Sequence, residues 1–135
     1  MISEVEQVDG TVQRFEHDGS DLALEHIGRM QAHAIEARQL IDAGKPALAR
    51  LMKVAEGVNS GQQRYIVDFL LGLYNGPRFP FDLTNLRAID ATLRSDCFTV
   101  LAMDAGACQQ EVHRYFDNGG ERFEAMAKRL GLNNE

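Results

Sequence analysis

The chain lacks several features that would define its class at once. It has no tryptophan, two cysteines and three prolines among 135 residues. So few cysteines exclude a disulfide scaffold, and so few prolines and glycines exclude a collagen-like or low-complexity chain. The longest apolar run, around Phe69 to Tyr74, is far shorter than the about 20 residues that a transmembrane helix needs. With 44% apolar and 25% charged residues, the composition is typical of one globular domain.

Motifs that carry chemistry are also missing. The chain has no Gly-x-Ser-x-Gly elbow, no glycine-rich phosphate loop and no Glu-x-x-His pair. His26 and His33 lie two helical turns apart, too far to share a metal ion. Cys108 and His113 would be out of register on one helix, with no third group to orient the imidazole. We therefore expect no metal, no cofactor and no catalytic residue, and predict that the chain is not an enzyme.

The net charge of −6 is confined to the start of the chain. Residues 1–36 hold eight acids and two bases, whereas residues 37–135 hold twelve of each. An acidic chain is repelled by phosphate backbones, so direct nucleic-acid binding is not expected. A protein partner with a basic surface is the better electrostatic match, unless the acids serve only to keep copies of the protein apart. The candidate binding residues in this stretch are Glu4, Glu6, Asp9, Glu16 and Asp18.

Residues 1–19 are predicted to form an acidic arm or hairpin. Asp9-Gly10 stands between stretches rich in β-branched residues, which is typical of a β-hairpin. Apolar residues from Val5 to Phe15 also fit a helical spacing, but Gly10 would then sit inside the helix. The N-terminal residues, which begin Met-Ile-Ser-Glu, contain no basic segment followed by an apolar core, as a signal peptide would require. Together with the low cysteine content, this predicts a cytoplasmic protein.

Residues 20–135 are predicted to form a single helical domain, because apolar residues recur there at helical spacing. Gly44 and Pro46 are expected to separate the first two helices, and Ser60 is expected to cap the third. The expected helices cover 21–43, 46–56, 60–74, a segment from Asp82 or Thr84 through Leu93, a segment capped by Ser95-Asp96 that reaches Phe116, and 121–130. The fold class is therefore all-α, a compact bundle of five to six helices, with the N-terminal hairpin as an added element.

Both cysteines fall within the expected 95–116 helix. Cys97 and Cys108 are eleven positions apart, which separates them by about 16 Å along one helix. A disulfide requires Cα atoms about 4.4–6.8 Å apart, so the two thiols cannot pair on a continuous helix. We expect both to be buried small apolar residues.

The loop after the 60–74 helix is a second candidate contact surface. Tyr74, Arg78 and Phe79 supply aromatic rings and a guanidinium, the groups enriched at protein interfaces. The alternative is that a proline-flanked phenylalanine closes the end of the bundle.

Three carboxylates lie among apolar residues: Asp68, Asp82 and Asp90. They are expected to cap helices or to pair with arginines, as Asp68 can with Arg64 one turn earlier. The alternative is that they line a small catalytic cleft.

The middle of the chain resembles a known family. The residues that carry the resemblance are Ser60-Gly61-Gln62, Asp68-Phe69-Leu70-Leu71, Tyr74-Asn75, Phe81-Asp82-Leu83, Leu86 and Asp90. They fall within about residues 48–103, and the family often has tryptophan where this chain has Tyr74. The family is a domain of unknown function found in short proteins carried on bacterial plasmids and integrated elements. The resemblance implies an accessory protein of a mobile element and supplies no catalytic residue.

Together these features predict a non-enzymatic protein-binding accessory protein. In a mobile element, the expected partner is a host nucleic-acid-guided defence complex, whose basic groove the acidic surface would occupy in the manner of an anti-CRISPR inhibitor. Two alternatives stay open. One is a small enzyme with a carboxylate-lined cleft. The other is a homo-oligomeric bundle, a homodimer in its simplest form, with the 21–43 helix as its interface.

Overall fold

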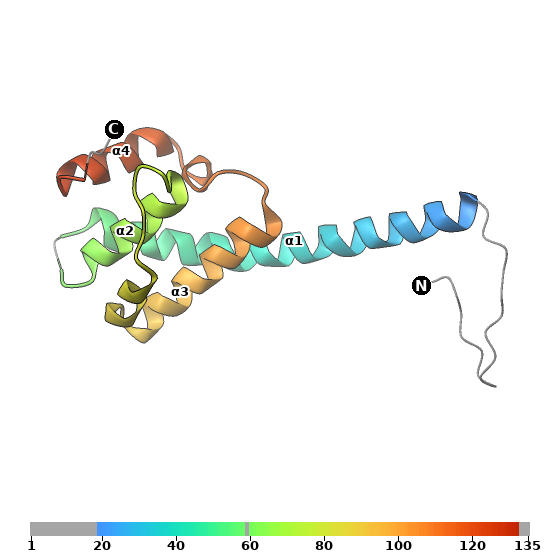
Figure 1. Cartoon of the computed structure of the whole chain (residues 1–135), viewed down its shortest axis with the longest axis horizontal. Coiled ribbons are helices and arrows are strands. Elements are labelled where there is room, and N and C mark those ends of the chain that lie inside the picture. The colour runs from blue at the N-terminus through green and yellow to red at the C-terminus, as the bar shows by residue number, and fades with distance from the viewer. Residues whose placement is uncertain (1–18, 59, 133–135) are drawn as a thin grey trace. The chain divides into compact units, whose positions relative to one another are not determined.

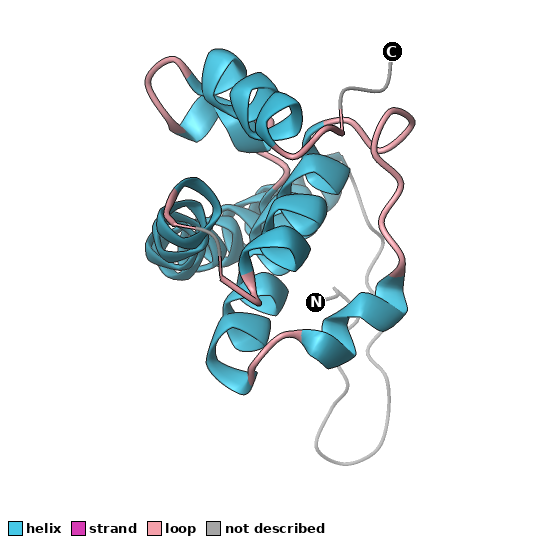
Figure 2. Ribbon diagram, turned by 90° about the vertical axis from the view of Figure 1, so that its left-hand side faces the viewer, coloured by secondary structure: helices cyan, strands magenta, loops and turns pink. Residues whose placement is uncertain are grey.

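The computed structural model of the protein describes residues 19–58 and 60–132. Its α-helices are α1 (Gly19–Glu56), α2 (Gln63–Tyr74), α3 (Ala91–Ala102) and α4 (Gly119–Arg129), as Figure 1 shows. Shorter helical turns are η1 (Leu83–Ala88), η2 (Met103–Ala107) and η3 (Val112–Tyr115). Because these described residues contain no strand, the predicted all-α class is confirmed (Figure 2). The expected hairpin lies outside the described residues.

The chain divides into two units between Glu36 and Ala37. The sequence places its boundary earlier, between residues 19 and 20. The division falls within α1, at the point where its residues change from mainly exposed to increasingly buried. The second unit contains the hydrophobic core and all the remaining helices.

α1 is one helix, so the predicted break at Gly44 is wrong. Gly44 is buried, and a Cβ there would lie 2.6 Å from the Cβ of Met103. The glycine therefore permits close packing of α1 against η2 rather than ending a helix. Pro46 lies inside α1 and removes one helical hydrogen bond. Burial of Ala47 and Leu48 directly after it stabilises the helix across that gap.

The end of α1 is stabilised by two side chains from distant elements. Gln63, only 2% exposed, donates from Nε2 to the backbone oxygens of Ala55 (3.0 Å) and Gly57 (2.8 Å). Arg129 on α4 also donates to the oxygen of Ala55. The predicted capping contact of Ser60 is present in part, because its Oγ accepts from the backbone N–H of Gln63 at 3.2 Å. These bonds satisfy carbonyl groups that a helix C-terminus leaves unpaired.

The predicted start of a helix at Ser95-Asp96 is also wrong. α3 begins at Ala91, because Asp90 accepts from the backbone N–H of Leu93 at 2.9 Å and caps the helix. Asp96 instead lies in the helix interior, 6% exposed, and accepts two hydrogen bonds from Arg50 of α1, at 2.9 and 2.8 Å. A short polar side chain can cap a helix or form a tertiary ion pair, and the contact with α1 decides which it does.

The expected helix through residue 116 ends much earlier. α3 passes into the π-helical turn η2 and stops at Cys108, whose φ of 52° lies in the left-handed region. Both cysteines are free, but only Cys97 is buried, and Cys108 is exposed, contrary to expectation. Burial raises the pKa of the Cys97 thiol to about 12, so that thiol is unreactive at neutral pH.

The core of the second unit is formed by the end of α1 and the three later α-helices, together with residues of the segments that join them. α2 contacts α4, η1 and η3, and α3 continues into η2. The largest completely buried side chains include Phe123, Leu48, Leu51, Ile66, Leu70 and Met103. α2 is buried on most of its circumference, as expected for the central helix of a bundle.

Candidate functional site

The loop after α2 is tied to α4 through one carboxylate. Arg78 forms a two-point ion pair with Glu124, at 2.7 and 3.1 Å, and the Tyr74 hydroxyl donates to the same carboxylate. The Arg78 guanidinium bond, followed by the Tyr74 bond, lowers the pKa of Glu124. Burial, followed by the bond to Glu124, raises the pKa of Tyr74. Two of the predicted contact residues therefore connect α2 to α4.

Phe79, the third predicted contact residue of this loop, is 5% exposed and belongs to the core. The Arg78 guanidinium lies 4.6 Å from the centre of its ring, in cation–π contact. Phe79 therefore takes the alternative role of closing the end of the bundle. The other predicted contact residues, Glu4, Glu6, Asp9, Glu16 and Asp18, lie outside the described residues.

Aromatic rings from three elements meet beside this ion pair. His113 of η3 lies edge-on to Tyr74, with ring centres 5.1 Å apart, and Tyr74 lies 5.2 Å from Phe123 of α4. The His113 Nδ1 atom is buried and has no hydrogen-bond partner among the described residues. Gly119 permits this packing, because its backbone lies directly against the carbonyl of His113. The cluster fastens η3 and α4 to α2.

The three candidate carboxylates belong to three different elements. Asp82 caps η1 by accepting from the backbone N–H of Thr84 at 3.0 Å, and Asp90 caps α3. Hydrogen bonds from Thr84 lower the pKa of Asp82. Asp68 lies within α2, 3.9 Å from Arg64. These are the capping and pairing positions expected of them.

Replacing Asp68 with asparagine should stabilise the protein at pH 7. Burial, only partly opposed by Arg64, raises the pKa of the Asp68 carboxyl. The folded state therefore binds this proton more tightly, and stability falls as pH rises from about 4, the ordinary carboxyl value, through the raised folded value. Urea denaturation at several pH values should show a gain for Asp68→Asn at pH 7 that disappears below about pH 4. A loss of stability at pH 7 would contradict this expectation.

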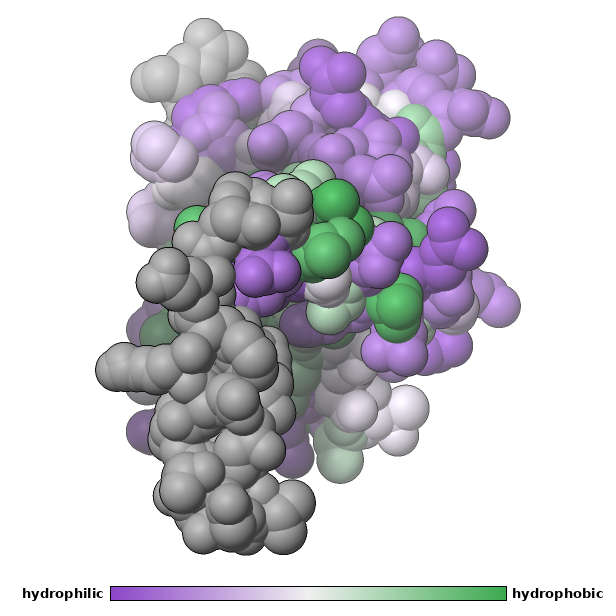
Figure 3. Space-filling view, turned by 90° about the vertical axis from the view of Figure 1, so that its right-hand side faces the viewer, coloured by the Kyte–Doolittle hydropathy of each residue, from purple (hydrophilic) through white to green (hydrophobic). Residues whose placement is uncertain are grey.

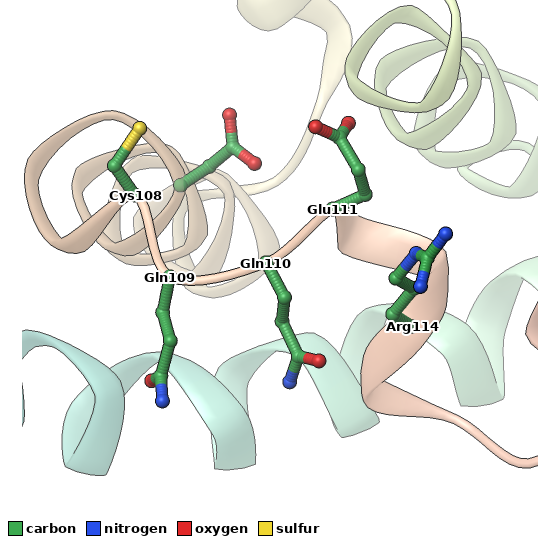
Figure 4. Close-up of a pocket in the computed structure, with 6 residues that line it drawn as sticks. Cys108, Gln109, Gln110, Glu111 and Arg114 are labelled. Atoms are coloured by element: carbon green, nitrogen blue, oxygen red, sulfur yellow. The ribbon is translucent and has the colours of Figure 1, made fainter.

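One hollow on the second unit follows η2. It has a volume of about 480 Å³ and is lined by Asp104, Cys108, Gln109, Gln110, Glu111 and Arg114. In Figure 4, Cys108 and Glu111 point to one side of the connecting segment, and Gln109 and Gln110 point to the other. Burial, followed by repulsion from Glu111, raises the pKa of Asp104. Most of its lining is exposed and polar, unlike the apolar lining of a typical small-molecule pocket.

Within residues 19–58 and 60–132, no group of three or more histidine, cysteine, aspartate and glutamate side chains is placed to hold a metal ion. No helix in the described ranges combines the length and the apolar character that crossing a membrane requires.

Among the described helices, the first half of α1 carries the most exposed large apolar side chains. Leu22, Leu24, Ile27, Met30 and Ile35 are between 47% and 66% exposed. Apolar side chains (green) reach the surface between hydrophilic ones (purple) in Figure 3, which views the molecule from the side where α1 begins. Single exposed leucines are common, but several along one helix mark an interaction surface.

One comparison with known proteins identifies a family. The family of unknown function DUF7673 matches residues 45–131. The chain belongs to this family. The DUF7673 match confirms the expected uncharacterised family and extends it beyond residue 103, through α4. No curated protein and no solved structure matches the chain.

The DUF7673 match covers the helices of the core and omits the exposed first half of α1. It begins at Lys45, the residue that follows Gly44 and its close approach to Met103. It ends at residue 131, just after α4. The exposed face of α1 is thus outside the DUF7673 region. Within that region the resemblance residues have structural roles: Gln62 bonds Ala88 and Asp90, and Asp82 and Asp90 act as caps.

From the sequence, the 21–43 helix is named only as the interface of the homo-oligomeric alternative, and none of its exposed apolar side chains is among the candidate binding residues. The signal for an apolar binding face was present, because Ile27, Met30 and Ala34 share a helical stripe that continues in spacing toward the core residues. A stripe of this kind predicts burial, and the sequence alone does not tell whether the protein's own core or another molecule covers it. The fractional exposure of these side chains provides that information.

Proposed function

We propose that the chain is a non-enzymatic protein-binding accessory protein that contacts its partners through residues 1–36. The single observation that carries this proposal is the set of five large apolar side chains around the first half of α1, each about half or more exposed. Exposed apolar surface of this kind gains free energy when another protein covers it. If the first half of α1 bound no other protein, its large exposed apolar side chains would favour aggregation.

Charge supports a basic partner. All of the chain's net charge of −6 lies in residues 1–36, where Asp21, Glu25 and Glu36 share α1 with a single arginine within its first half, Arg29. Acidic surfaces accelerate association with basic partners and disfavour acidic ones. The proposed partner is therefore a protein with a basic surface, and direct binding of nucleic acid is not part of the proposal.

A more specific form of the proposal gives the protein a location and a role in the cell. We place the protein in the cytoplasm as a product of a mobile element, where it inhibits a host nucleic-acid-guided defence complex by occupying its basic groove. The resemblance to plasmid-borne proteins and the acidic N-terminal region support this form. No cofactor takes part.

The proposal predicts a partner that reversal of the N-terminal charges would release. We would capture partners of the tagged full chain from a bacterial lysate at low and high salt and identify them by mass spectrometry. Converting Glu4, Glu6, Asp9 and Glu16 to lysine should remove a stoichiometric basic partner, as high salt should.

A matched control reverses four exposed acids of the second unit, Asp42, Glu111, Asp117 and Glu121, and changes the net charge equally. This control should retain the partner. Equal loss in both variants would show an effect of bulk charge and overturn the proposal. A captured partner that has no nucleic-acid groove would overturn the inhibitor form alone.

A further inference from the structure

The exposed face of α1 has a regular spacing. Ala23, Ile27, Met30, Ala34 and Ala37, here called the seam, alternate between steps of four and three residues. This is the heptad spacing of helices that pair along their length. In the sequence the same steps continue to Ile41, Gly44, Leu48, Leu51 and Ala55, which the core buries wholly or in part. Ile27 and Met30 occupy the same heptad positions as these core residues, but their side chains are 47% and 57% exposed.

Formal charges avoid the seam. The charged residues of α1 between 21 and 37 are Asp21, Glu25, Arg29 and Glu36. At 100° per residue, all four lie about 120–200° around the helix from Ile27. Leu24 and Gln31 flank the seam on one side and His26 and His33 on the other, and the charged Arg38 continues the flank of Leu24 and Gln31 just past Ala37. A partner helix would therefore meet an apolar strip with no buried charge to neutralise.

We propose that a second copy of this chain covers the seam, with the two α1 helices antiparallel. This inference rests on the proposed function, because it takes residues 1–36 to be a protein-binding region and names the molecule that covers the apolar face of α1 within it. The argument for a second copy is complementarity of shape. The side chains of the seam are large at Ile27 and Met30 and small at Ala34 and Ala37. The seam is therefore complementary in shape to the seam of a second chain that runs in the opposite direction.

Antiparallel pairing gives the layers formed by residues 27 to 37 similar widths. With the two-fold axis near residue 32, Met30 of one copy faces Ala34 of the other, and Ile27 faces Ala37. Large residues then meet small ones at each level, as in well-packed cores. A parallel pair would stack isoleucine on isoleucine and alanine on alanine, which forces the helices apart at one end and leaves a gap at the other. Antiparallel helix dipoles also attract.

The pairing leaves the acidic groups available. Asp21, Glu25 and Glu36 lie on the opposite side of α1 from the seam, and the seam spans about 21 Å. Two acidic N-terminal regions would then enter the dimer at opposite ends, which supplies two contact points for a basic partner. Because the seam is short, the dimer should be reversible and depend on protein concentration.

The first test measures the mass of the purified full chain by sedimentation over a concentration series. The mass should rise from monomer to dimer as concentration increases. Ala34→Glu should weaken the dimer about tenfold or more, because it places a carboxylate in the seam. Ala32→Glu adds the same charge two residues away on the exposed outer face and should leave the dimer intact. A monomer at every concentration, or equal effects of the two variants, would overturn the inference.

The second test measures orientation by disulfide crosslinking, in a Cys108→Ser background because Cys108 is the exposed native thiol. Met30→Cys and Ala34→Cys proteins should crosslink when mixed, and neither should crosslink to itself. Crosslinking of each to itself would indicate a parallel pair and refute the proposed register.

The two proposals fail separately. A monomer that still captures a salt-sensitive partner refutes the dimer and leaves the proposed function standing. A dimer whose partner capture survives reversal of the N-terminal acids refutes the proposed charge-dependent binding alone.

Discussion

Gly119→Ala is expected to lower the free energy of unfolding by about 3 kcal/mol or more. Gly119 begins α4 and is buried against η3. A Cβ at this position would overlap the backbone oxygen of His113 and lie 2.7 Å from its carbonyl carbon. Because the obstacle is backbone rather than a flexible side chain, α4 and η3 must separate to make room. That movement would disturb the contacts of Tyr74 with His113 and Phe123.

Gly120→Ala is the matched control for this prediction. Gly120 is the next residue of the same helix, and a Cβ there would approach only the His113 ring, at 3.9 Å. This is ordinary contact, so alanine should be neutral or stabilise by up to about 1 kcal/mol through helix propensity. Urea denaturation of both variants measures the difference. Similar stabilities of the two proteins would show that α4 does not need its close approach to His113.

Gln63→Glu is expected to lower the free energy of unfolding by the second largest amount, after Gly119→Ala. The side chain keeps its shape, but the amide that donates to Ala55 and Gly57 becomes a carboxylate facing two carbonyl oxygens. A buried unpaired charge typically costs about 3 kcal/mol or more, whereas Gln63→Met, which only removes the donors, should cost about 2 kcal/mol. The measurement is urea denaturation at pH 7 of the wild type and both variants.

The pH dependence of Gln63→Glu provides an independent check. Burial beside carbonyl oxygens raises the pKa of the introduced carboxyl in the folded state, so the folded protein binds its proton more tightly. The deficit should therefore be smallest near pH 4 and grow as pH rises from there. Gln109→Glu, at an exposed position, should lose little stability at any pH. A deficit for Gln63→Glu that stays constant with pH would contradict the buried contact.

The all-α class could be predicted because it depends on local patterns that the chain repeats many times. Apolar residues at helical spacing appear from residue 20 to 130, and caps such as Asp82 are short-range signals. Gly44, Ser95 and Asp96 show where local signals fail. Each resembles a helix terminus by residue type, but each lies inside a helix.

The candidate site shows the same division. Asp68, Asp82 and Asp90 have the pairing and capping roles that their positions predict, because those roles involve residues within one helical turn. Arg78 and Glu124 are 46 positions apart, and no local pattern couples them. The burial of Phe79 likewise depends on the helices around it. Residue type alone is compatible with an interface and with a core.

The sequence by itself determined the helical class, the low cysteine and proline content, the cap of η1 by Asp82 and the concentration of acid before residue 37. These follow from residue types and short spacings, which act within a few positions of the chain. Only the tertiary structure decided that α1 continues through Gly44 and Pro46, that Cys108 is exposed and that Ile27 and Met30 of the seam are about half exposed. In each case the deciding contact, or its absence, involves groups far apart in the sequence, and a helical stripe looks the same whether or not another surface buries it.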